Sequence, residues 1–163
     1  ASSGSGAVVI FRVTLQRSSL QAPIHCTSNM SSSPGKQRGM KRMLREVKKA
    51  GDEAFRSGKF DESIKHYSFC ISAASRGAFI KSSRLVVLLG NRSAAYTAIA
   101  SYELALNDAD TCLAIRPEWP KGWIRRGLAL QGLRQHEAAA AAFKKAHLEG
   151  DASALDLLNN SLD

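Results

Sequence analysis

Two pairs of residues separated by the same distance constrain the fold of this chain more than any other feature. Leu89 and Trp123 are 34 residues apart. Ala105 and Ala139 are separated by the same interval. A fixed period of this length is typical of arrays in which each supersecondary unit buries its apolar face against the next unit. The spacing therefore predicts an array of stacked repeats.

The residues around these anchors match the consensus of one repeat type. Its pattern of aromatic and small residues on two helices, followed by Pro, is that of the tetratricopeptide repeat. The three copies are Val47, Ala50, Gly51, Ala54, Ser63 and Tyr67; Leu89, Arg92, Ser93, Tyr96, Ala105, Ala109 and Pro117; and Trp123, Arg126, Gly127, Leu130, Ala139 and Phe143. The predicted fold is all-α: an α-α superhelix of three tetratricopeptide helical hairpins plus a C-terminal capping helix.

The expected boundaries follow from this register. The repeats are predicted at about residues 44–77, 86–119 and 120–153, and the capping helix at 152–162. Copies one and two are 42 residues apart, so eight extra residues are expected near 76–83, as a lengthened helix or a loop. The capping helix is expected to begin after Asp151 and to cover the end of the stack with Ala154, Leu155, Leu158 and Leu162.

The segment 1–39 differs from the rest of the chain. It is rich in Ser and Gly and has no acidic residue, so we expect a disordered tail, followed by the repeat domain at 40–163. Met40 is the first residue of the helical apolar pattern. An acid-poor, Ser- and Arg-containing start is typical of an organellar transit peptide, but Ala1–Gly6 is equally typical of an expression scar. The expected location is cytoplasmic, or organellar if the segment is a transit peptide.

The net charge of +9 lies mainly in this amino-terminal part. Residues 1–45 carry seven Lys or Arg and no Asp or Glu, whereas residues 46–163 carry sixteen basic and fourteen acidic residues. The repeat domain is thus nearly neutral, which argues against nucleic-acid binding. A weaker alternative is nucleic-acid or membrane-surface binding by the basic residues Lys36, Arg38, Lys41, Arg42 and Arg45.

Motifs for catalysis, metal binding or membrane insertion are not found in the sequence. It has no Gly-rich phosphate loop, nucleophile motif, metal-ligand spacing or long apolar run. The cysteines are too widely spaced for a disulfide framework. Cys70 and Cys112 occupy equivalent repeat positions, so we expect them to be small core residues. We expect neither an enzyme nor a cofactor, and no membrane span.

The candidate binding residues lie on the first helix of each hairpin, because these helices line the concave groove of such arrays. Lys48 and Asp52 share one helix face, and Lys121 and Arg125 share another. Asn91 lies on the middle first helix. Lys and Arg side chains bind carboxylates, and Asn adds an amide donor. The groove therefore favours an anionic ligand.

Three stretches make a resemblance specific: Val47–Phe55 (VKKAGDEAF), Asn91–Tyr96 (NRSAAY) and Arg116–Arg125 (RPEWPKGWIR). Over about residues 44–150 the chain resembles the tetratricopeptide domains of heat-shock co-chaperones. The resemblance implies a monomeric adaptor for the carboxy-terminal Glu-Glu-Val-Asp peptide of the seventy- and ninety-kilodalton chaperones. It implies a dicarboxylate clamp that grips the free carboxylate and the aspartate side chain of that peptide.

Four residues match this clamp in type and position: Lys48, Asn91, Lys121 and Arg125. The fifth position departs from it, because Asp52 stands where the family has a second Asn. Asp52 adds a like charge to a carboxylate site. Either Lys48 neutralises it and the clamp is weakened, or the groove prefers another ligand. The alternative function is therefore a repeat scaffold for an unrelated protein partner.

Overall fold

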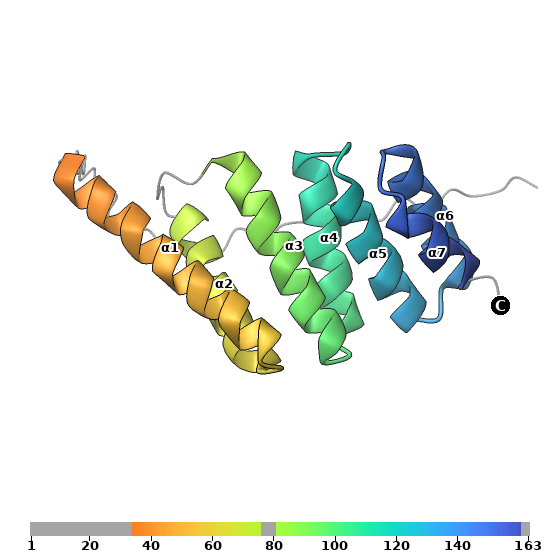
Figure 1. Cartoon of the computed structure of the whole chain (residues 1–163), viewed down its shortest axis with the longest axis horizontal. Helices are drawn as coiled ribbons and strands as arrows, with labels where there is room; N and C mark the ends of the chain where they lie inside the picture. Colours follow the sequence, from red (N-terminus) through yellow and green to blue (C-terminus); the bar gives the residue numbers. More distant parts are fainter. Residues whose placement is uncertain (1–33, 76–80, 161–163) are drawn as a thin grey trace, which may run out of the picture. The chain divides into compact units, whose positions relative to one another are not determined.

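The computed structural model describes residues 34–75 and 81–160, and all regular elements within these ranges are α-helices. The helices stand side by side in chain order (Figure 1). They are α1 Pro34–Arg56, α2 Phe60–Ser75, α3 Ser82–Ala98, α4 Tyr102–Ile115, α5 Pro120–Gly132, α6 His136–Leu148 and α7 Ser153–Asn159. The predicted all-α array of three hairpins plus a final helix is confirmed.

Each helix packs against the one that follows it, as expected for a stack of hairpins. The first helices of the second and third hairpins, α3 and α5, also contact each other, whereas α1 does not pack closely on α3. Trp119 fills the space beside α3, where a Cβ on Gly90 would lie only 2.7 Å from the indole ring. The array is therefore closed between α3 and α5 and more open between α1 and α3.

The hairpin turns repeat the spacing found in the sequence. Gly58, Ala100 and Arg134 all have positive φ angles, of 74°, 57° and 62°. In each turn the residue after this position donates its backbone N–H to the carbonyl five residues earlier, at 2.9 Å. The three turns are thus structurally equivalent, and they are separated by the same intervals of 42 and 34 residues as the sequence repeats. Only the first turn uses glycine, which adopts this conformation without steric cost.

The core between paired helices is built from the residues of the repeat signature. Tyr67 and Phe143 are almost fully buried. The Phe143 ring lies against Gly127, where a Cβ would clash with it. Cys70 and Cys112 are buried, and their thiols donate to the backbone carbonyl oxygens of residues 44 and 86, respectively. The prediction that both cysteines are small core residues is confirmed.

The structure corrects the start of the first helix. α1 begins at Pro34, not Met40, so residues 34–39 are helical and do not belong to a disordered tail. Pro is favoured in the first helical turn and Lys, Gln and Arg are good helix formers, but this segment has no apolar residue to give a periodic pattern. Residues 1–33 lie outside the described residues.

The insertion and the capping helix follow the prediction in part. α3 starts at Ser82, so some of the extra residues lengthen this helix, while residues 76–80 lie outside the described ranges. In α7, Ala154 is buried and Leu158 packs on the core, as expected. Leu155 is 43% exposed, and Leu157 packs in its place. Leu162 is not among the described residues.

Candidate functional site

The predicted groove residues come from three helices. Lys48 and Asp52 lie on α1, Asn91 on α3, and Lys121 and Arg125 on α5. A pocket of about 240 Å³ brings several of them together. It is lined by Asp52, Phe55, Arg56, Tyr67, Asn91, Ala94 and Arg125. Lys48 joins this group through its ion pair with Asp52, whereas Lys121 lies one turn before Arg125 and is exposed.

The Asp52 carboxylate is held by three side chains from three helices. Lys48 Nζ lies 2.6 Å from one carboxylate oxygen, in an i,i+4 ion pair. The hydroxyl of Tyr67 donates to the other oxygen at 2.8 Å, and Asn91 Nδ2 donates to it at 3.3 Å. Both side chains of the ion pair are about one-third exposed, so solvent still reaches them. Asp52 is thus an internal carboxylate that already binds two of the predicted clamp residues, Lys48 and Asn91.

Tyr67 is a member of this network that sequence reasoning assigned only to packing. Its side chain is 1% exposed, and burial together with the bond to Asp52 raises its pKa to about 12. A neutral Tyr67 is therefore a fixed donor to Asp52 at all ordinary pH values. The structure shows how Tyr67 reaches Asp52: a Cβ at Gly51 would lie 3.0 Å from the Tyr67 ring, so the helix position next to Asp52 packs on this aromatic residue.

The α5 end of the site differs, because its charges are not compensated. Within residues 34–75 and 81–160, neither Lys121 nor Arg125 has a hydrogen-bond or ion-pair partner. Arg125 is partly buried, and this burial lowers its pKa from the ordinary value. A guanidinium nevertheless stays protonated in proteins. An unpaired, partly desolvated cation in a pocket favours binding of an anion.

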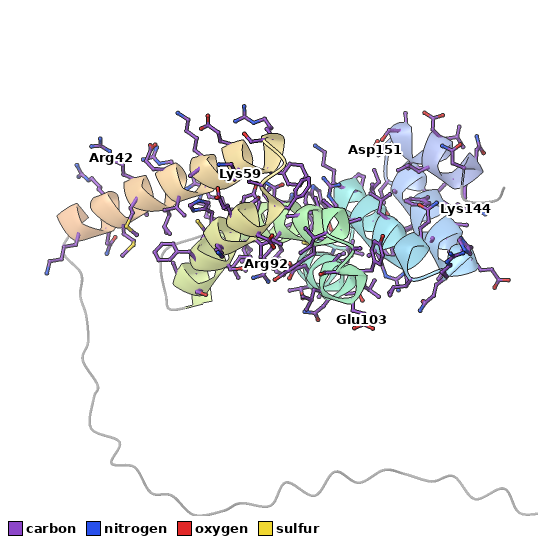
Figure 2. The ribbon with its side chains drawn as sticks, turned by 90° about the horizontal axis from the view of Figure 1, so that it is seen from below. Arg42, Lys59, Arg92, Glu103, Lys144 and Asp151 are labelled. Carbon is purple, nitrogen blue, oxygen red and sulfur yellow. The ribbon has the colours of Figure 1, made fainter. Side chains whose placement is uncertain are left out.

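Arg92 follows Asn91 but is not available to a ligand. Its guanidinium forms two bonds to Asp108, of 2.8 and 2.7 Å, and a third to the Ser68 hydroxyl at 2.9 Å. The bond to Asp108 raises the pKa of Arg92. Figure 2 labels the Arg92 side chain, which is mostly buried between the helices. The paired geometry supports a structural role for Arg92.

Comparisons with known proteins agree on one family. Heat shock protein sti1 homolog of Schizosaccharomyces pombe is 35% identical over 117 residues, which cover 72% of this chain and 18% of that protein. Hsp70-Hsp90 organizing protein of Triticum aestivum is 39% identical over 103 residues, covering 63% of this chain and 16% of that protein. The chain carries a tetratricopeptide repeat domain, which is similar in sequence to part of each of these two proteins. No protein-family model matches it.

Solved structures of tetratricopeptide domains have the same fold as this chain. The second such domain of human RPAP3, in complex with the HSP70 peptide SGPTIEEVD, has a TM-score of 0.63 and 25% identity over 76% of this chain and 98% of that one. The first TPR of Spaghetti (RPAP3), bound to the HSP90 peptide SRMEEVD, has a TM-score of 0.63 and 24% identity, covering 72% of this chain and 89% of that one.

The match concerns the domain and not whole proteins. The chain spans less than one-fifth of the length of the two relatives named above. In the part of this tetratricopeptide domain that the structure describes, there is no cluster of His, Cys, Asp or Glu that could hold a metal ion. The described helices also include none that is both long and apolar enough to cross a membrane.

Proposed function

We propose that this domain is a co-chaperone adaptor module that binds the acidic carboxy-terminal peptide of heat-shock chaperones of the seventy- or ninety-kilodalton class. The observation that carries the proposal is Arg125, a cation that has no ion-pair partner among residues 34–75 and 81–160 and that shares a pocket with Asn91. Lys121 adds a second cation one turn away on α5. Similar domains have been solved with peptides that end in Glu-Glu-Val-Asp, which supports a ligand of this kind.

The energetics are consistent with a transient adaptor. A hydrogen bond to a charged group contributes about 1.5–3 kcal/mol. A few such bonds, less the entropy lost when a flexible peptide is ordered, lead to a dissociation constant on the order of 1 μM. Asp52 reduces this affinity, since its negative charge lies in the part of the site where the peptide carboxylate would bind. Lys48 offsets much of that charge.

The direct test is calorimetric titration of the domain with the peptide SRMEEVD. We expect binding that is lost when the peptide carboxy terminus is amidated, because amidation removes the charge that the site recognises. Lys121→Ala should also weaken binding, by about fivefold, since an exposed cation contributes less than a partly buried one. Absence of binding at a protein concentration of about 100 μM, a hundredfold above the expected dissociation constant, would contradict the proposal.

One observation favours a second candidate, a scaffold for an unrelated protein. Asp52 already accepts bonds from Lys48 and Asn91, so these two side chains are not free for a peptide carboxylate. Asp52→Asn separates the candidates. In a chaperone-tail site it should tighten SRMEEVD binding by about tenfold, by removing a like charge and adding an amide donor. In a scaffold it should leave that peptide unbound and weaken the natural partner instead.

The proposal includes a non-enzymatic, monomeric protein that works in the cytoplasm without a cofactor, a nucleic acid or a membrane. The sequence supports this through its lack of catalytic and metal-binding motifs and through the near-neutral charge of residues 46–163. An organellar location stays the alternative if residues 1–39 are a transit peptide. Residues 1–33 of that segment are not among those the structure describes.

A further inference from the structure

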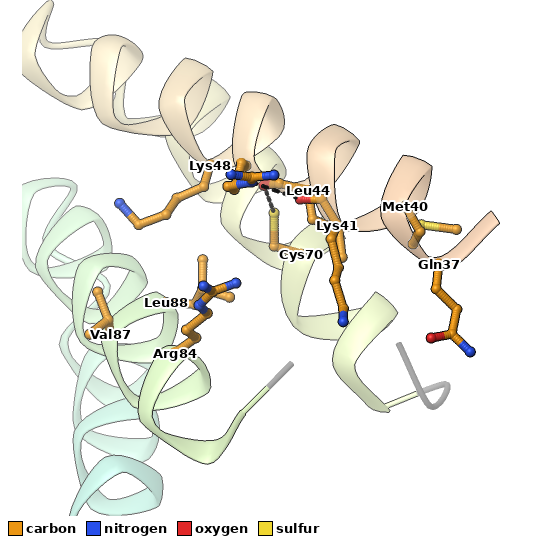
Figure 3. Close-up of a pocket in the computed structure, with 10 residues that line it drawn as sticks. Gln37, Met40, Lys41, Leu44, Lys48, Cys70, Arg84, Val87 and Leu88 are labelled. Atoms are coloured by element: carbon orange, nitrogen blue, oxygen red, sulfur yellow. Dashed lines mark hydrogen bonds between the residues drawn. The ribbon is translucent and has the colours of Figure 1, made fainter. Parts of the chain in front are cut away.

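A second pocket, of about 300 Å³, lies between the amino-terminal half of α1 and the start of α3 (Figure 3). We call it the α1–α3 pocket. Its lining residues are Gln37, Met40, Lys41, Leu44, Arg45, Lys48, Cys70, Arg84, Val87 and Leu88. The volume is at the lower end of the range for ligand-binding pockets. The pocket exists because α1 does not pack closely on α3 and because these two helices are longer than the other described helices.

The floor of the α1–α3 pocket is apolar and preformed. Leu44, Cys70 and Leu88 belong to the buried core between the first two hairpins. The Cys70 thiol donates to the backbone oxygen of residue 44, and burial raises its pKa, so it acts as a wall and not as a nucleophile. Met40 is 45% exposed at the edge, and its flexible thioether can adapt to a bound side chain.

The rim of the pocket has one sign of charge. Four of its ten lining residues are Lys or Arg, from both helices, and none is Asp or Glu. On α1 the cations at positions 41, 45 and 48 follow each other at one-turn spacing. Arg84 lies across the pocket from α1, on α3 (Figure 3). The whole segment 34–45 has five basic residues and no acidic one. Apolar floor and cationic rim together define the chemistry of the occupant.

We propose that the α1–α3 pocket is a second peptide-binding site, which takes an apolar side chain of a partner protein from a segment in which that side chain is flanked by Asp or Glu. Lys41 and Arg45 lie one turn apart on α1 and Arg84 adds a charge from α3, whereas Lys48 contributes less because it is paired with Asp52. These spread cations match several side-chain carboxylates along a segment better than one terminal carboxylate. The site therefore binds an internal acidic segment. It goes beyond the proposed clamp, with which it shares only Lys48.

A protein segment fits this surface better than a membrane does. The apolar residues Leu44 and Leu88 are buried at the bottom of a concave pocket and cannot enter a lipid layer. Membrane-surface helices instead carry a protruding apolar face. The outward face of α1 carries Arg42, which projects away from the neighbouring helices (Figure 2). We therefore favour a protein segment as the ligand, and the vesicle experiment below distinguishes it from a membrane.

The test uses an acetylated and amidated peptide, Glu-Glu-Leu-Leu-Glu-Glu-Phe, which lacks a free carboxy terminus for the clamp. Binding is measured with protein labelled with ¹³C at the methionine methyl groups. Met40 lines the pocket, whereas Met43 is similarly exposed on the same helix but does not. We expect the Met40 methyl resonance to shift on titration and that of Met43 to move little. A version of the peptide with Lys in place of Glu should not bind.

The matched variants are Arg84→Glu and Arg42→Glu, which make the same charge change at two exposed positions. Only Arg84 lines the pocket. We expect Arg84→Glu to weaken peptide binding by about tenfold, and Arg42→Glu by about twofold at most, through long-range electrostatics. Equal losses would overturn the proposal, because they would indicate attraction to overall charge only.

Two further measurements distinguish binding at the α1–α3 pocket from binding at the clamp and from binding to a lipid surface. Lys121→Ala and Arg125→Ala should leave binding of the capped peptide unchanged even though both weaken SRMEEVD binding, so either site can fail alone. Vesicles of anionic phospholipid should not bind more strongly to the parent protein than to Arg84→Glu. Vesicle binding that depends on Arg84, with no peptide binding, would overturn the proposal in favour of a membrane surface.

Discussion

The two ends of the candidate clamp carry the same kinds of cation, but only the cation at the α1 end is paired with a carboxylate within the described residues. At the α1 end, Lys48 is paired with Asp52 at 2.6 Å, and Tyr67 and Asn91 donate to the same carboxylate. At the α5 end, Lys121 and Arg125 have no such partner in the described ranges, and Arg125 is partly buried. A matching residue type at a family position therefore does not imply an equal contribution to ligand binding.

The difference follows from what a ligand carboxylate meets at each end. At the α5 end it meets unpaired charge in a pocket, where attraction is only partly screened. At the α1 end it meets an ion pair whose two charges largely cancel, so the net attraction on the ligand carboxylate is small. We infer that most of the affinity for an anionic peptide comes from α5, with the α1 end acting mainly as a polar wall.

The largest expected effect is that of Arg125→Ala. Removing an unpaired, partly buried guanidinium should cost about 1.5–3 kcal/mol of binding free energy, a ten- to hundredfold loss in affinity for SRMEEVD. The matched control is Arg126→Ala on the same helix, since Arg126 is already paired with Asp110 at 2.8 Å and does not line the pocket. Equal losses in both variants, measured by calorimetry, would contradict a special role for Arg125.

The fold was largely predictable from sequence because its determinants are local and repeated. Small residues such as Gly127 are needed where an aromatic such as Phe143 crosses from the paired helix. The 34-residue period then fixes which residues share the groove. This local information placed Asp52, Asn91 and Arg125 around one pocket without any knowledge of distances.

The state of the site was less predictable because it depends on contacts between helices. Whether Asp52 is solvated or bonded is decided by Tyr67 on α2 and Asn91 on α3, which are 15 and 39 residues away. The α1–α3 pocket was also missed. Its walls include the start of α1, where residues 34–39 have no apolar pattern, and an α3 lengthened by the insertion.

A smaller effect should appear in the alkaline stability of the α1 end. The pKa of Tyr67 is raised from 10.0 to about 12 in the folded protein, so above pH 10 the unfolded chain loses the proton first. The stability present below pH 10 is therefore lost as pH rises toward 12, by about 1 kcal/mol at pH 11. Urea unfolding, followed by tryptophan fluorescence, should show this loss.

Tyr67→Phe removes the titrating group and is the control for that measurement. Its stability at neutral pH should be lower, because the bond to Asp52 is lost, but the decline between pH 10 and 11 should be smaller than in the parent protein. Cys112, whose pKa is also raised to about 12 by burial, contributes a decline that starts near pH 9 in both proteins. An identical decline in parent and variant would mean that Tyr67 is not held as a buried donor.

The smallest expected effect comes from removing the α1 ion pair as a unit. Lys48→Ala alone should weaken SRMEEVD binding, because it leaves the Asp52 charge uncompensated beside the peptide carboxylate. The double variant Lys48→Ala/Asp52→Asn removes both charges, and the introduced amide keeps an oxygen that can accept the Tyr67 bond. Its affinity should stay within about threefold of the parent protein, or about 0.6 kcal/mol. A loss as large as that of Arg125→Ala would instead make Lys48 a principal carboxylate ligand, and the two ends of the clamp would then be equivalent despite Asp52.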